Sequence, residues 1–396
     1  MRSIRPDVPA GVLALMVCVF GVTTGEFVIA GILPDVAGDL DVSISAAGLL
    51  VTAYAIGMIV GGPVLTALTS RTARKPLITG LLAIVVAGNL ASALAPNYPV
   101  LFAARIVTSL VTATFFANAI VIAASSAPPG KQASTVSTLV FGMNLSMILG
   151  APIGTLIGNG FGWRSTFVAI AACCALGWML VRRLVPDVRE AAPATSAVAE
   201  LRVFRRRDVQ LAIALTAVGN AGLLAVFTFL APLSTDVTGF ADGAIPLLLL
   251  TYGVGAAVGN VIGGRLSDRA PMAAQSGLLA ALAAALVLIW TVSGNRVLTA
   301  IMVFVVGALG FSVIPGMQAR VLTTAAEAPT LAMAVNASAY QLAAALGAWL
   351  GGRVVNDGPG LRSIYLFAAA TTVVAILLGG YAWRRDRAAV AVTSAS

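Results

Sequence analysis

Residues 54–61 read YAIGMIVG, and residues 252–259, which lie 198 positions further along, read YGVGAAVG. The tyrosine and the glycines three and seven residues after it occur in both copies. Each copy lies in an apolar run long enough to cross a lipid bilayer as a helix. A duplicated membrane-spanning stretch predicts an all-α membrane protein built from two related halves.

A second duplication supports the first. A shift of 197 residues aligns another pair of apolar runs, in which Asn144 meets Gln341, Gly150 meets Gly347 and Gly154 meets Gly351. Both shifts are close to half of the 396 residues. Two repeated halves that face each other create a cavity at the membrane midplane, and rocking of the halves opens it to either side.

The composition places most of the surface in lipid. Hydrophobic residues make up 59% of the chain and charged residues 10%, whereas a soluble domain carries about 25% charged residues. The chain has no histidine, which excludes histidine metal sites and Ser-His catalysis, and its three cysteines lie in apolar runs as small hydrophobic residues. No phosphate-binding loop of an ATP-driven pump and no cluster of catalytic groups is visible. We therefore expect neither an enzyme nor a nucleic-acid-binding protein.

Twelve mostly apolar segments approach the length that a spanning helix needs. They are residues 10–32, 46–68, 76–95, 99–121, 133–159, 163–182, 209–232, 243–265, 272–293, 297–317, 330–353 and 361–384. The first segment lacks a cleavage site followed by a soluble domain and is interpreted as a retained helix. The pattern predicts a six-helix bundle over 1–182, a cytoplasmic linker over 183–208 and a second six-helix bundle over 209–396.

The basic residues predict the orientation. With both termini in the cytoplasm, the cytoplasmic segments hold 19 of the 24 lysines and arginines and the opposite side holds four. The remaining one, Arg105, lies inside a span. This inside-positive bias predicts a multi-pass protein of the bacterial inner membrane, in contact with lipid.

Four stretches carry recognisable motifs. They are GPVLTALTSRTARK at 62–75 with its copy GRLSDR at 264–269, RIVTS at 105–109, GAPIG at 150–154, and TGEFV at 24–28. Together they resemble the major facilitator superfamily, and within it the twelve-helix drug:proton antiporter branch of chloramphenicol-resistance exporters and arabinose-type efflux permeases. The resemblance covers essentially the whole chain. It implies the major facilitator fold, with twelve helices around a central cavity, and a monomeric transporter that works by alternating access.

The resemblance also implies a set of residues that control conformation. They are Gly62, Arg71, Arg74, Lys75, Gly264, Asp268, Arg269, Gly150, Pro152 and Gly154. The alternative for the basic members is plain anchoring at the cytoplasmic surface, and for Gly150, Pro152 and Gly154 it is helix packing alone. Ser70 stands where Asp268 stands in the other half, so the family's aspartate latch is neutral in the first half.

Glu26 and Arg105 are the charged residues well inside the apolar segments. Each lies about six residues from the same outer surface, which is a depth of ~9 Å. Opposite charges at equal depth in a low-dielectric medium attract each other. Our hypothesis is that Glu26 binds the coupling proton and that protonation releases Arg105. The alternatives are a static ion pair and direct binding of a cationic substrate by Glu26.

The family architecture also predicts which residues line the cavity and bind substrate. The polar or aromatic residues near mid-helix are Tyr54, Asn118, Asn144, Asn220, Phe227, Tyr252, Asn336, Tyr340 and Gln341. Some of these amides are expected to bond between helices instead. With no second buried acid, the set favours proton-coupled export of a small neutral or amphipathic molecule, such as a chloramphenicol-like drug. The alternative is uptake or exchange of a sugar, nucleoside or related metabolite. No cofactor is expected beyond the coupling proton.

Overall fold

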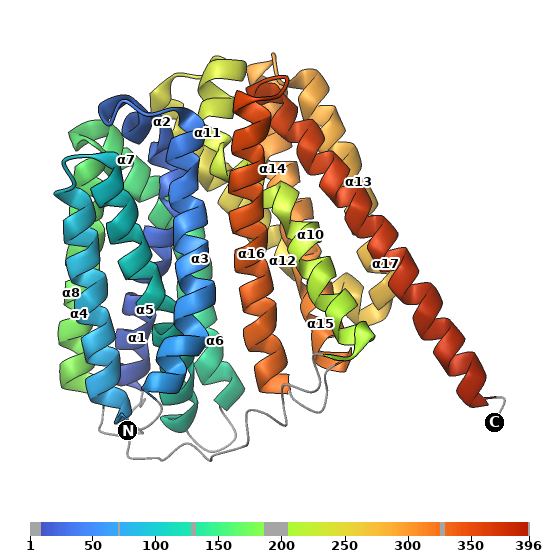
Figure 1. Ribbon diagram of the computed structural model, residues 1–396, viewed down its shortest axis with the longest axis horizontal. Helices are drawn as coiled ribbons and strands as arrows, with labels where there is room; N and C mark the ends of the chain where they lie inside the picture. Colours follow the sequence, from blue (N-terminus) through green and yellow to red (C-terminus); the bar gives the residue numbers. More distant parts are fainter. Residues whose placement is uncertain (1–8, 70–71, 128–131, 186–204, 325–328, 395–396) are drawn as a thin grey trace, which may run out of the picture. The chain divides into compact units, whose positions relative to one another are not determined.

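The computed structural model describes residues 9–69, 72–127, 132–185, 205–324 and 329–394 (Figure 1). The described ranges form helices and contain no strand, which confirms the all-α fold class. Contacts between the helices divide the chain into two units. The first comprises residues 1–43 and 53–193, and the second comprises residues 44–52 and 194–396.

The first half of the chain consists of helices joined by short connections. They are α1 (Ala10–Phe27), α2 (Ile29–Asp39), α3 (Ile44–Leu68), α4 (Arg74–Ala93), α5 (Tyr98–Ser125), α6 (Gln132–Leu145), a π-helix (Ser146–Gly150), α7 (Ala151–Phe161) and α8 (Trp163–Leu184).

The second half of the chain likewise consists of helices joined by short connections. Its elements are α10 (Arg207–Thr228), α11 (Leu230–Pro232), a π-helix (Leu233–Val237), a 3-10 turn (Asp242–Ala244), α12 (Ile245–Arg269), α13 (Pro271–Val292), α14 (Arg296–Ser312), α15 (Ile314–Thr324), α16 (Pro329–Asn356), a second 3-10 turn (Leu361–Ser363) and α17 (Ile364–Ser394).

Eleven helical segments in the described ranges are long and apolar enough to cross a membrane. They correspond to eleven of the twelve predicted spans. The twelfth, predicted over 330–353, is the 28-residue helix α16. The chain thus has the twelve-helix architecture that the sequence predicts.

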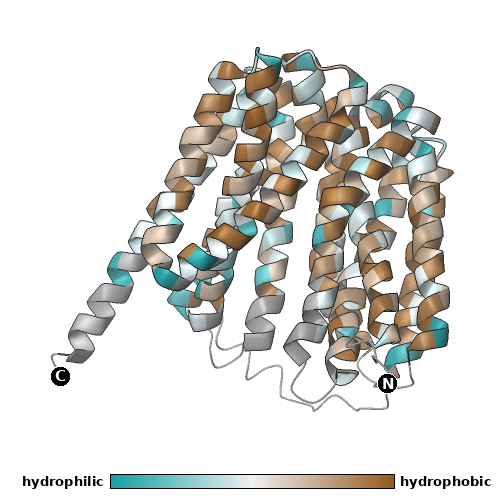
Figure 2. Ribbon diagram, turned by 180° about the vertical axis from the view of Figure 1, so that it is seen from behind, coloured by the Kyte–Doolittle hydropathy of each residue, from teal (hydrophilic) through white to brown (hydrophobic). Residues whose placement is uncertain are grey.

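The outer faces of the helices are apolar. Figure 2 shows hydrophobic residues along most of the helix length and hydrophilic residues gathered toward helix ends. Large apolar side chains such as Phe161, Leu247 and Leu377 are more than half exposed. Because contiguous apolar surface of this extent is unfavourable in water, lipid is the medium that suits these faces.

The sequence repeat corresponds to equivalent helix contacts. A methyl group added at Gly61 on α3 would overlap the backbone of Leu110 on α5, and one added at Gly259 on α12 would overlap the backbone of Ala308 on α14. The same holds for the other aligned pair, because Gly150 packs against α1 and Gly347 packs against α10. The glycines therefore recur because each half needs the same close helix crossings.

Replacement of Gly259 by alanine is expected to lower the melting temperature of the purified protein in detergent. The added methyl group would meet the carbonyl oxygen of Ala308, which is backbone and cannot turn aside. Overpacking of this kind costs about 1–3 kcal/mol. The matched control is Gly277→Ala on α13, where the added methyl group meets nothing within 4 Å. Equal melting temperatures for the two variants would contradict the close crossing of α12 and α14.

The first turns of α3 group with the second unit. The Ser45 hydroxyl lies 2.8 Å from the carbonyl oxygen of Gly352 and 2.9 Å from Oδ1 of Asn356. The Thr52 hydroxyl donates to the carbonyl of Ala345 at 3.1 Å. Helix α3 therefore contributes to both units, a feature that the predicted boundaries do not include. Most of the predicted linker, residues 186–204, lies outside the described residues.

Candidate functional site

The first helix of the chain is interrupted at Val28. Helix α1 ends at Phe27 and α2 begins at Ile29, and the Val28 N–H donates to the carbonyl of Thr24 at 2.9 Å. Val28 keeps helical backbone angles, so the interruption is a one-residue irregularity after which the helix continues as α2. It lies in the interior of the first unit, directly after Gly25 and Glu26, whose carbonyl groups accept contacts from another helix.

Arg105, on α5, binds these carbonyl groups. Its Nη1 donates to the carbonyl of Gly25 at 2.6 Å, and its Nη2 lies 3.5 Å from the carbonyl of Glu26. The side chain is among the largest that are fully buried in the described ranges, with 1% of its surface exposed. The carbonyl groups of Gly25 and Glu26 thus compensate part of the cost of burying this cation.

The aromatic ring of Tyr54, on α3, covers the guanidinium. The central carbon of the Arg105 guanidinium lies 4.3 Å from the ring centroid, in cation–π geometry. The Tyr54 hydroxyl lies 3.1 Å from the hydroxyl of Thr112. Because the Thr112 hydroxyl donates to the carbonyl of Thr108, the phenol is the donor between the two. Tyr54, a predicted cavity residue, is thus buried and engaged within the first unit.

Glu26 completes the group. Its side chain is partly exposed, and its carboxylate interacts electrostatically with both Arg105 and Tyr54. The two residues that the sequence places at equal depth are therefore neighbours in the first unit. The Arg105 guanidinium contacts the main-chain carbonyl of Glu26. It also interacts electrostatically with the Glu26 carboxylate.

The glycine motif of the fifth span packs against this break. A methyl group at Gly150 would overlap the Thr24 hydroxyl, and one at Gly154 would lie 2.6 Å from a methyl group of Val28. The π-helix Ser146–Gly150 precedes Pro152. Proline lacks an N–H and clashes with the carbonyl four residues earlier, which accounts for the wider turn. The glycines therefore hold the interrupted part of the first span against its neighbour.

A second polar cluster, at the rim of the first unit, joins the end of α2, the segment after α4 and the start of α8. The Arg164 guanidinium pairs with the Asp39 carboxylate and donates to the carbonyl of Ala95 at 3.0 Å, while the Trp163 indole N–H donates to Asp39 at 3.2 Å. The hydrogen bonds from Arg164 and Trp163 hold the pKa of Asp39 below its ordinary value. The stabilisation is present at neutral pH and is lost as the pH falls through that lowered pKa. Because the pair is exposed, it contributes about 0–1 kcal/mol.

The second unit has a buried cluster of aromatic and amide side chains. The Tyr252 ring lies 5.1 Å from that of Phe227 and 6.3 Å from that of Phe311, measured between centroids. The Thr216 hydroxyl donates to Oδ1 of Asn336 at 2.7 Å, and Asn220 donates to the carbonyl of Thr216 at 2.8 Å. Two buried atoms in this group, the Tyr252 hydroxyl and Oδ1 of Asn220, have no hydrogen-bond partner.

The other predicted residues are distributed more widely. Asn118 is buried and donates to the carbonyl of Thr114 in its own helix, whereas Asn144 is exposed. Tyr340 and Gln341 lie on α16, and both have interaction partners. Gly62, Arg74, Lys75, Gly264 and Arg269 lie near helix ends on α3, α4 and α12. Arg71 and the side chain of Asp268 lie outside the described part, so the latch stays a prediction.

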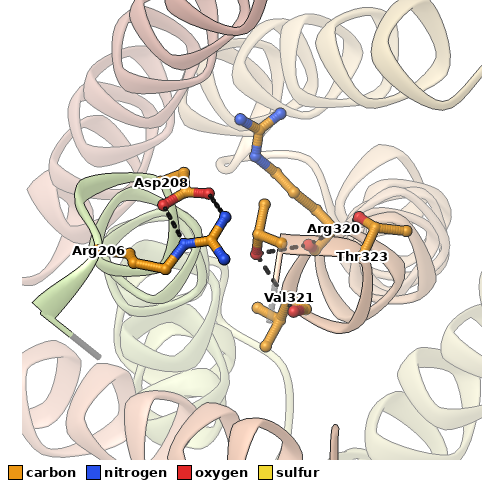
Figure 3. Close-up of polar contacts among 6 residues, drawn as sticks. Arg206, Asp208, Arg320, Val321 and Thr323 are labelled. Carbon is orange, nitrogen blue, oxygen red and sulfur yellow. Dashed lines mark hydrogen bonds and ion pairs between the residues drawn. The ribbon is translucent and has the colours of Figure 1, made fainter. Parts of the chain in front are cut away.

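The basic run at 205–207 lies at the start of α10 in the second unit. Figure 3 shows Arg206 paired with Asp208 at the start of α10, with Nη2 of Arg206 2.9 Å from Oδ2 of Asp208. Asp208 lies in the first turn, where the helix dipole favours a negative charge. At the end of α15, the hydroxyl of Thr323 donates to the carbonyl of Arg320 at 3.0 Å. These contacts define helix ends rather than a binding site.

The fold is that of a multi-pass membrane protein, and comparison with known families identifies its class. The model of the Major Facilitator Superfamily matches residues 15–331. The chain therefore belongs to the Major Facilitator Superfamily, as its motifs predict, and is a multi-pass transporter of the inner membrane rather than an enzyme.

Relatives match over almost their whole length. A protein named "Chloramphenicol resistance protein" from Streptomyces lividans is 37% identical, with 92% of this chain and 95% of that protein covered. "Inner membrane transport protein YdhP" from Escherichia coli K12 is also 37% identical, with 96% and 98% covered. The crystal structure of a D-xylose-proton symporter superposes with a TM-score of 0.72 at 18% identity, with 93% and 96% covered. That structural likeness shows the fold alone.

Proposed function

We propose that this chain is a proton-coupled exporter of a small neutral or amphipathic molecule, working by alternating access. The observation that carries the proposal is the buried Arg105 guanidinium bound to main-chain carbonyl groups of α1, next to Glu26. Buried ionisable residues in membrane spans are costly and commonly mark a proton or substrate pathway. The distribution of basic residues supports a topology with both termini in the cytoplasm.

In the proposed cycle Glu26 carries the proton. A proton from outside binds a carboxylate oxygen of Glu26, which removes the negative charge beside Arg105 and favours one facing of the transporter. Release of that proton to the cytoplasm restores the attraction between the two side chains. Substrate binding favours the deprotonated form, so that outward movement of substrate is exchanged for inward movement of a proton. A ligand moves such an equilibrium only through its different affinity for the two states.

The substrate class follows from the uncharged character of the other predicted ligand-contact residues. In the second unit these are aromatic rings and amides, among them Phe227, Tyr252 and Asn220. Such groups suit an amphipathic molecule with a few hydroxyl or amide groups, as in chloramphenicol-like drugs. The relative from Streptomyces lividans, which carries chloramphenicol resistance in its name, supports this choice.

A sugar or other metabolite is the second candidate. A protein named "Probable sugar efflux transporter" from Mannheimia succiniciproducens is 28% identical over 92% of this chain. Aromatic rings and amides bind sugars as readily as they bind drugs. Uptake or exchange of a sugar or nucleoside by the same fold would leave drug accumulation unchanged.

Expression in an efflux-deficient bacterial host separates the candidates. We expect several-fold lower accumulation of chloramphenicol than in cells with empty vector, and a return to the vector level when a protonophore collapses the proton gradient. A drug-susceptibility panel run in parallel identifies the most strongly exported compound. Unchanged accumulation and susceptibility across the panel, together with accelerated sugar or nucleoside uptake, would contradict drug export.

A further inference from the structure

The ring of Tyr54 occupies a place that its counterpart in the repeat does not. Tyr54 aligns with Tyr252, and position 105 aligns with Val303. Tyr252 packs against the rings of Phe227 and Phe311. Tyr54 instead packs against the Arg105 cation and is 2% exposed. The two aligned tyrosines thus have different neighbours, which are aromatic rings for Tyr252 and a cation for Tyr54.

The guanidinium of Arg105 has few other restraints. Its Nη1 bond to the carbonyl of Gly25 is short, its Nη2 contact with Glu26 is at the limit of hydrogen bonding, and its Nε has no hydrogen-bond partner. The face of the Tyr54 ring therefore fixes the plane and the depth of the cation. The ring is itself held by the hydroxyl of Thr112, 3.1 Å away on α5, the helix that carries Arg105.

We propose that Tyr54 is a positioning residue, whose ring holds Arg105 beside Glu26 and so keeps the carboxylate in its charged form until the coupling proton arrives. The inference rests on the proposed function of Glu26 as the proton site. It assigns Tyr54 to coupling within the first unit rather than to contact with substrate.

The charged and titratable groups that act on the site come from four helices. In the described ranges they are Glu26 on α1, Arg105 on α5, Tyr54 on α3 and the Cys174 thiol on α8, which interacts electrostatically with Tyr54. Helix α4 contributes the uncharged amide of Asn89, which is buried and donates to the carbonyl of Val85 in its own helix. Arg105 is the positive charge of this group, so its position governs the proton affinity of Glu26.

The test is an infrared titration of the full chain in liposomes. The carbonyl band of a protonated carboxyl group is followed against pH, and the part that disappears in Glu26→Gln belongs to Glu26. We expect Tyr54→Leu to move the midpoint of that band upward by about one pH unit, a tenfold change in proton affinity. Tyr54→Phe and Thr112→Val both keep the ring and remove the hydrogen bond between the two hydroxyls, so each should move the midpoint in the same direction as Tyr54→Leu by a smaller and similar amount.

The control is Tyr365→Leu, which removes an equally buried tyrosine on α17 in the second unit and should leave the midpoint unchanged. A Tyr54→Leu midpoint equal to that of the wild type, or an equal shift in Tyr365→Leu, overturns the positioning role. A wild-type protein without any Glu26-dependent band contradicts the proposed proton site itself. The two failures are therefore distinguishable, and neither readout requires the substrate to be known.

Discussion

Replacement of Arg105 by leucine is expected to abolish transport and to destabilise the protein by about 3–5 kcal/mol, because it leaves buried polar groups without their cation. The carbonyl of Gly25 loses its 2.6 Å hydrogen bond, and the Glu26 carboxylate loses the neighbouring positive charge. The measurements are the melting temperature in detergent and drug export from cells. Arg105→Lys keeps the charge but not the two-pronged geometry, so intermediate stability is expected.

The matched comparison is Arg164→Leu at the rim. Arg164 also donates to a main-chain carbonyl and in addition pairs with the Asp39 carboxylate, but about two fifths of its side chain is exposed. Exposed pairs contribute about 0–1 kcal/mol. Near-equal losses of melting temperature in Arg105→Leu and Arg164→Leu would contradict the expectation that burial makes the contacts of Arg105 more stabilising.

Replacement of Glu26 by glutamine is expected to abolish export against a concentration gradient while leaving the folded protein intact. The amide is similar in shape to the carboxyl group but cannot exchange a proton. Drug accumulation should rise to within about twofold of cells with empty vector, and its dependence on external pH should disappear. Asp39→Asn is the matched control, because it removes an acid on the adjoining helix α2 that pairs with Arg164 at the rim.

The two alternatives for Glu26 predict different results. A static ion pair predicts that Glu26→Gln lowers the melting temperature but keeps the wild-type pH dependence of export. Direct binding of a cationic substrate predicts selective loss of resistance to cationic drugs, with export of neutral drugs retained. Measurement of one cationic and one neutral drug across external pH therefore separates all three.

The sequence predicted the span pattern and the repeat, because both depend on periodic composition. Gly61 and Gly259 occur at equivalent crossings, as their alignment indicates. Counting residues from the span ends also paired Glu26 with Arg105, and the Arg105 guanidinium contacts the main chain of Glu26. These features do not require knowledge of how side chains pack.

Other features of the site depend on tertiary contacts and left no local signal. The interruption at Val28 occurs in TGEFVIAG, which contains no proline. The contact of Tyr54 with Arg105 joins α3 to α5, so spacing along the chain cannot reveal it. The sequence assigned Tyr54 to the cavity because an aromatic residue near mid-helix fits either role. The contacts of Ser45 with α16 likewise join residues more than 300 positions apart.

The most direct test of the account is substrate-induced proton release from the purified protein. The drug that the susceptibility panel selects is added to the protein in weakly buffered detergent solution containing a pH indicator, and drug binding is measured in parallel. If Glu26 is the coupling site, the wild-type protein releases protons on binding the drug, and Glu26→Gln binds the drug without releasing any. Proton release by Glu26→Gln equal to that of the wild-type protein would contradict the assignment of Glu26 as the coupling site.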